Sequence, residues 1–160
     1  MGSERAAALA ADFAAANEAA LQFAGSCSDA DWNRRVPGED WTVGVVLHHI
    51  AEGHTNGLRW LRSMASGEGV SETAEDIDNA NAAHAVRAGT VGQVETAALL
   101  AHNGALLEQA LRSLTDEELD CSAPFGPAGD RKLPTADLAA VAARHTRGHL
   151  SSAQSAIARV

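Results

Sequence analysis

The 160-residue chain is close to the length of one average domain, and its apolar fraction of 46% is sufficient to build a hydrophobic core. A formal net charge of -9 leaves no large basic surface, which argues against nucleic acid or an anionic membrane as a partner. The first residues lead into an alanine-rich amphipathic stretch without a long apolar run, so we expect no signal peptide, no membrane span and a cytoplasmic protein. The two cysteines, Cys27 and Cys121, are too few for a disulfide framework and are expected to be free thiols.

The first two predicted helices cover most of the N-terminal half. Apolar residues recur at steps of three and four over residues 4–25, which predicts a helix with one buried stripe. Residues 26–38 contain Gly, Ser and Pro and are expected to form a linker with one short capped turn. Thr42 can cap a second helix, which continues until Ser66 and Gly67.

The C-terminal half is predicted to contain two further long helices. Residues 67–89 are acidic and punctuated by Gly and Asn, which predicts a long connection with a single helical turn. Thr90 and Gln93 form a capping-box pattern for a third helix that ends near Leu114. A short capped turn follows, then a loop over residues 121–134, and Thr135 opens a fourth helix. No strand is expected, so residues 1–160 are predicted to form a single all-α domain, a four-helix bundle.

The fourth helix carries two histidines on its predicted core stripe. His145 and His149 are one turn apart, so both imidazoles can reach one ion on the same side of the helix. The sequence between them lacks the Glu of the H-E-x-x-H form, which argues against a metalloprotease. From the spacing alone, two half-buried histidines bonded to the backbone or to solvent are an equally good interpretation.

The second helix supplies a polar-interrupted face that complements this pair. His49, Glu52 and Asn56 share a face with Val45 and Trp60. Burying a polar side chain without a partner commonly costs about 1–3 kcal/mol, so a bound metal ion would explain three of them on one stripe. We therefore expect His49, His145 and His149 to bind a divalent metal.

The remaining polar candidates are assigned lesser roles. Glu52 is a candidate general base or a support for a ligand, and a solvated or Arg-paired carboxylate is an equal alternative. His54 and His84 are expected at the surface or in the connection, and His102 on the core face of the third helix. None of these three histidines is expected to bind the metal.

Residues 41–52, with Trp41, Thr42 and His49, resemble the Trp-to-His helix motif of the DinB-like superfamily of metalloenzymes, and the C-terminal H-x-x-x-H matches as well. That superfamily includes bacillithiol and mycothiol transferases and the mycothiol-dependent maleylpyruvate isomerase. The resemblance implies an up-down-down-up bundle with a long connection between helices two and three. It also implies His49, His145 and His149 as the ligands and a small thiol as the nucleophile.

Two classes of function follow from these residues together with the resemblance, which supplies the thiol. The first is a metal-dependent transferase or isomerase that activates a low-molecular-weight thiol such as mycothiol, with Glu52 as its base and a small-molecule substrate. Zinc is the favoured divalent metal, with nickel or another ion left open. Three histidines would leave a coordination position free for water or substrate, which favours an enzyme. The second is a non-catalytic module that binds a metal or a small molecule. A homodimer is left open.

Overall fold

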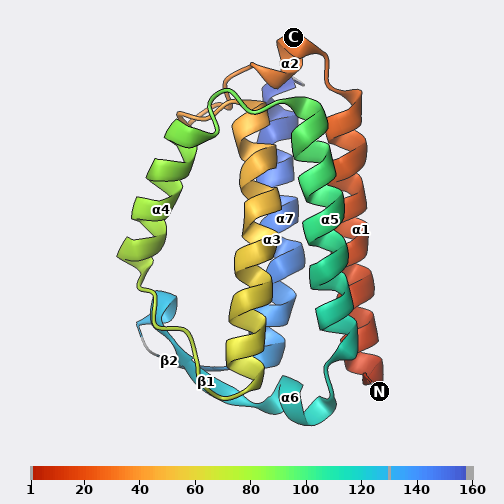
Figure 1. Ribbon diagram of the computed structural model, residues 1–160, viewed down its shortest axis with the longest axis vertical. Helices are drawn as coiled ribbons and strands as arrows, with labels where there is room; N and C mark the ends of the chain where they lie inside the picture. The colour runs from red at the N-terminus through yellow and green to blue at the C-terminus, as the bar shows by residue number, and fades with distance from the viewer. Residues whose placement is uncertain (1, 130, 158–160) are drawn as a thin grey trace.

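Four long helices run along the long axis of the computed structural model, which describes residues 2–129 and 131–157 (Figure 1). They are α1 (Glu4–Ser26), α3 (Val43–Ala65), α5 (Gln93–Ser113) and α7 (Thr135–Ile157). In Figure 1, α1 and α7 run upward, whereas α3 and α5 run downward. The predicted up-down-down-up bundle is therefore confirmed, and its two consecutive parallel helices, α3 and α5, need a connection that returns along the length of the bundle.

The helix starts agree with the sequence pattern at most positions. The side chain of Thr42 accepts a hydrogen bond from the backbone N–H of Val45, as expected for the cap of α3. The predicted capping box of α5 is wrong, because the helix begins after Gly92 and has no side-chain cap. The amide of Gln93 instead donates to the carbonyls of Ala24 and Cys27 at the end of α1, which lack partners within their own helix.

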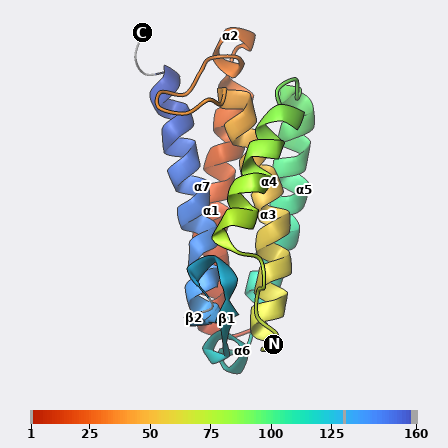
Figure 2. The same ribbon diagram turned by 90° about the vertical axis from the view of Figure 1, so that its left-hand side faces the viewer.

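The connection between α3 and α5 contains more helix than expected. The 14-residue helix α4 (Ala74–Arg87) follows a capping box made by Thr73 and Asp76. It lies outside the bundle, beside α3, as Figures 1 and 2 show. The prediction of a single turn was wrong because α4 buries only one of its residues, His84, and so has no apolar stripe to recognise.

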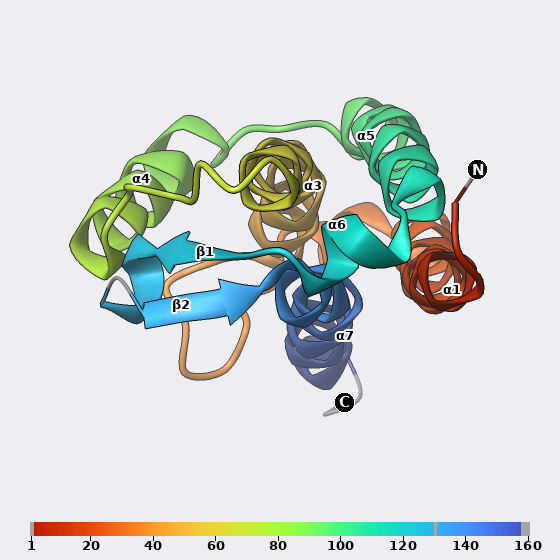
Figure 3. The same cartoon turned by 90° about the horizontal axis from the view of Figure 1, so that it is seen from below.

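The predicted loop before α7 contains a small sheet, so the expectation of no strand was also wrong. After α6 (Asp116–Asp120), β1 (Ser122–Phe125) pairs antiparallel with β2 (Arg131–Pro134) around the 3-10 turn Gly126–Ala128. The pair crosses beneath the lower end of the bundle towards α4 (Figure 3). Each strand has only four residues and contains a proline, which gives no alternating pattern.

The buried face of α1 consists mostly of alanines. Ala6, Ala10 and Ala20 of α1 are fully buried, which lets this helix approach its neighbours closely around Phe13. The short helix α2 (Asp29–Trp32) buries Trp32 against the start of α3. None of the helices described is both long and apolar enough to cross a bilayer.

Candidate metal centre

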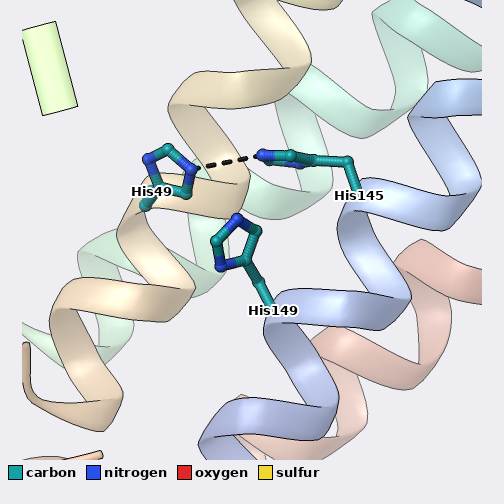
Figure 4. A group of neighbouring side chains, drawn as sticks. All are labelled: His49, His145 and His149. Carbon is teal, nitrogen blue, oxygen red and sulfur yellow. Dashed lines mark hydrogen bonds between the residues drawn. The ribbon is translucent and has the colours of Figure 1, made fainter. Parts of the chain in front are cut away.

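Three histidines converge between α3 and α7. His49 lies on α3, and His145 and His149 lie one turn apart on α7, with all three rings directed towards one another (Figure 4). The Nε2 atoms of His49 and His145 are 3.2 Å apart, and the candidate ligand atoms of all three lie within 4.8 Å of one another. The structure thus brings together the three residues that the sequence predicted as ligands.

The spacing fits a tetrahedral ion. Two nitrogens bound at about 2.05 Å to a tetrahedral ion lie about 3.3 Å apart, close to the 3.2 Å between His49 and His145. The centroid of the His149 ring lies 4.6 Å from the centroids of both other rings. His149 can therefore bind the same ion as His49 and His145. Three imidazoles would occupy three tetrahedral positions and leave the fourth free.

Burial keeps the three imidazoles neutral. It lowers the pKa of His49 to about 3, with the neighbouring histidines His149 and His145 adding to the effect. Burial also lowers the pKa of His145 to about 4, and it lowers that of His149, against the opposing charge of Glu39. Only a neutral imidazole offers a lone pair to a metal, so the lowered pKa values favour the metal-binding form of the site.

Two neighbouring residues hold the rings in place. The indole of Trp41 packs on His49 at 4.9 Å and stacks on His149 at 6.4 Å, with an interplanar angle of 20°. Gly53 lies opposite the ring of His145, and a Cβ atom there would stand 2.9 Å from Cε1 of that ring. The absence of a side chain at Gly53 is therefore what lets His145 reach His49.

A cavity of about 300 Å³ adjoins the three histidines. Its walls are largely apolar and aromatic, and its lining includes Trp60, Leu138, Val141, Ile77 and Phe125. Ile77 comes from α4 and Phe125 from β1, the two elements that the sequence pattern did not predict. The described lining residues include no Asp, Glu, Lys or Arg.

Glu52 does not join this cavity. Its carboxylate is directed towards α4, where Oε2 lies 3.8 Å from Nε2 of His84 and 3.6 Å from the guanidinium of Arg87. The pairing with an arginine is the alternative that sequence reasoning had left open. Nothing in this arrangement brings the carboxylate to the three histidines.

The other histidines correct the sequence expectations. His54 is buried rather than at the surface, and His102 is exposed rather than on the core face of α5. His84 lies in the connection, as expected, but it is buried there. His54 bonds to the side chain of Asn17 at 2.9 Å, and Asn17 donates to the carbonyl of Leu100. The sequence did carry a signal for this network, because Asn17 interrupts the apolar stripe of α1 one turn after Phe13.

Comparison with known proteins agrees with this architecture. The model of the DinB superfamily matches residues 12–153. Among solved structures, YfiT from Bacillus subtilis superposes with a TM-score of 0.81 at 16% identity, covering 99% of this chain and 89% of its own. YfiT is described as a probable metal-dependent hydrolase with an unusual four-helix bundle topology. No curated protein matches the chain in sequence at a significant level. With most of its length matched by the family model and its bundle order shared with YfiT, the chain belongs to the DinB superfamily.

Proposed function

We propose that the protein is a metal-dependent transferase that holds one divalent ion, preferably zinc, through His49, His145 and His149 and activates a low-molecular-weight thiol. The observation that carries this proposal is the uncharged cavity beside the open side of the three histidines. Structural zinc is normally closed by four protein ligands, whereas three ligands and an adjoining cavity are typical of a catalytic centre.

The residues around the cavity favour a thiol over water as the nucleophile. When bound, a divalent ion lowers the pKa of a coordinated thiol so that the thiolate forms without a separate base. Attack by water is usually assisted by a general base, often a carboxylate. No carboxylate is present among the described lining residues, and Glu52 is directed towards His84 and Arg87 of α4.

The lining also favours an uncharged electrophile. The aromatic rings of Trp60 and Phe125 offer apolar contact area, and Asn56 and Asn81 offer amide groups for orientation. No cationic side chain is present among the described lining residues, so the ion itself would be the positive charge that an anionic substrate such as maleylpyruvate meets. The largely apolar walls favour transfer to a neutral, apolar acceptor over the isomerase reaction.

Two other functions are alternatives to the thiol transferase: a hydrolase and a non-catalytic binding module. The description of YfiT favours hydrolysis, in which water replaces the thiol. A binding module would hold the metal and a small molecule without turnover, and the enclosed apolar cavity would serve it equally well.

A conjugation assay separates the three functions. The metal-free protein and the zinc-loaded protein are incubated with 1-chloro-2,4-dinitrobenzene and with mycothiol, bacillithiol or cysteine, and thioether formation is followed by absorbance. We expect thioether and chloride to form faster than in the uncatalysed reaction of thiol and probe only when the zinc-loaded protein is present. Zinc-dependent loss of ester probes without thiol would support the hydrolase, and zinc binding without turnover would support the binding module.

Ligand variants complete the test. His49→Ala, His145→Ala and His149→Ala should each abolish tight zinc binding and conjugation together, because each removes one of three donors. His102→Ala is the matched control, since its imidazole is exposed on α5 and is not among the residues that line the cavity. Tight binding that survives all three ligand substitutions would refute the assignment.

A further inference from the structure

A second group of potential ligands lies on the adjacent face of α3. His48 and Glu52 are one turn apart on this helix, and His84 faces them from α4. Nδ1 of His48 lies 2.9 Å from Nε2 of His84, and Oε2 of Glu52 lies 3.8 Å from the same nitrogen. The candidate ligand atoms of all three lie within 4.8 Å of one another.

The burial of His84 is unusual for the helix that carries it. It is the one buried residue of α4, with 3% of its surface exposed, where a helix that packs on a bundle normally inserts an apolar side chain. Its Nε2 atom faces Nδ1 of His48 and the carboxylate of Glu52, so possible donor atoms from two helices meet at one point. A divalent ion at this point would bind all three side chains, which explains why a polar ring is buried here.

These three side chains line a cavity of their own. It has a volume of about 270 Å³, which leaves room for an ion with bound waters. It shares no lining residue with the cavity beside the three-histidine cluster. Glu95 adds a second carboxylate to its wall, and Arg87 adds a cation.

We propose that His48, Glu52 and His84 form a second, weaker binding site for a divalent transition-metal ion. Donors bound at about 2.05 Å that subtend 90° at the ion are about 2.9 Å apart, and wider angles give longer separations. The 2.9 Å and 3.8 Å separations lie in the resulting range. Two imidazoles and one carboxylate suit first-row divalent ions such as Zn²⁺ or Fe²⁺.

The site would fix α4 on the bundle. Because α4 has no apolar stripe, a bond from His84 through an ion to α3 would replace the missing hydrophobic contact. Ile77 and Asn81 of the same helix line the cavity beside the three histidines, so the second ion would also order one wall of that cavity. This inference does not depend on the reaction proposed above.

Arg87 provides the sharpest test, because its charge opposes an incoming cation. Its guanidinium lies 3.6 Å from Glu52 and is largely exposed, so it can be removed without disturbing the core. If Glu52 binds a metal, Arg87→Ala should tighten that binding by roughly tenfold. If Glu52 serves only as the partner of Arg87, the substitution leaves metal binding unchanged.

The experiment isolates the second site by removing the first. In the double variant His145→Ala and His149→Ala, Zn²⁺ is titrated calorimetrically, and amide hydrogen exchange in α4 is measured with and without Zn²⁺. We expect about one Zn²⁺ per chain, slower exchange in α4, roughly tenfold or greater loss of affinity with Glu52→Gln, and tighter binding with Arg87→Ala. His84→Ala should also lose Zn²⁺ binding, but it removes a buried side chain. Glu52→Gln is the more decisive variant, because it removes the charge of the proposed ligand and keeps the shape of its side chain.

Three results would overturn the proposal. They are no Zn²⁺ bound by the double variant, Zn²⁺ binding that Glu52→Gln leaves intact, and an affinity that Arg87→Ala does not raise. Wild-type protein that binds one tight Zn²⁺ and no second would also contradict the second site, while it would leave the three-histidine centre standing. A double variant that binds like the wild type would instead count against that centre.

Discussion

Gly53→Ala should separate metal binding from stability. The new Cβ atom would stand 2.9 Å from Cε1 of His145, where ordinary contact begins at 3.4 Å, so the ring must move by about 0.5 Å. Metal–ligand distances tolerate deviations of only about 0.2 Å. We therefore expect zinc affinity to fall by roughly 10- to 100-fold, the range typical of a misplaced ligand.

The metal-free protein should not suffer the same loss. The atom that must yield is the far end of a side chain, and replacing Gly by Ala in a helix interior stabilises it by about 1 kcal/mol. Zinc titration and urea unfolding in chelator measure the two effects separately. The free energy of unfolding of Gly53→Ala should therefore equal or exceed that of the wild type.

Gly148→Ala is the matched control. This glycine lies between the two ligands of α7, yet a Cβ atom there would meet nothing within 4 Å. The substitution should raise the free energy of unfolding by about 1 kcal/mol and leave zinc affinity unchanged. Zinc binding by Gly53→Ala that is as tight as that of the wild type would refute the clash with His145. Equal losses of zinc affinity in Gly53→Ala and Gly148→Ala would refute it as well.

Three further predictions concern pH, the cysteines and the start of α3. Burial lowers the pKa of His54 to about 4, so its neutral form stabilises the metal-free fold fully above pH 6.5, and this contribution is lost as the pH falls from 6.5 towards 4. The free energy of unfolding, measured with urea at pH 7 and at pH 5, should fall with the pH, and His54→Gln should reduce this fall by up to about 1.4 kcal/mol per pH unit. A pH dependence that His54→Gln leaves unchanged would contradict the assignment. Cys27 follows directly after α1 and Cys121 directly after α6, and these two helices end at opposite ends of the bundle (Figure 1). Burial raises the pKa of Cys27 to about 11. A thiol reagent should therefore modify half-buried Cys121 first and both cysteines in denaturant without reductant, whereas a disulfide between them would contradict the topology. Gly44→Ala would drive a Cβ atom into the indole of Trp32, and we expect a loss of roughly 1–3 kcal/mol in the free energy of unfolding, with unchanged stability as the contrary result.

The sequence by itself determined the four long helices and the three-histidine cluster. Apolar residues at steps of three and four identify a helix that packs on a core, and the family resemblance supplied the order of the bundle. The i and i+4 spacing of His145 and His149 places both rings on one face whatever the rest of the fold does. His49 could be paired with them because it interrupts an apolar face.

Tertiary structure decided everything that has no periodic signal. The helix α4 and the β1–β2 pair bury too few residues to leave a pattern, yet they supply Ile77 and Phe125 to the cavity wall. Glu52 and His49 are only three residues apart on α3, but packing turns the carboxylate towards α4 and the imidazole towards α7. The periodicity of a helix fixes which residues share a face, whereas the neighbour that this face meets depends on how the other helices pack around it.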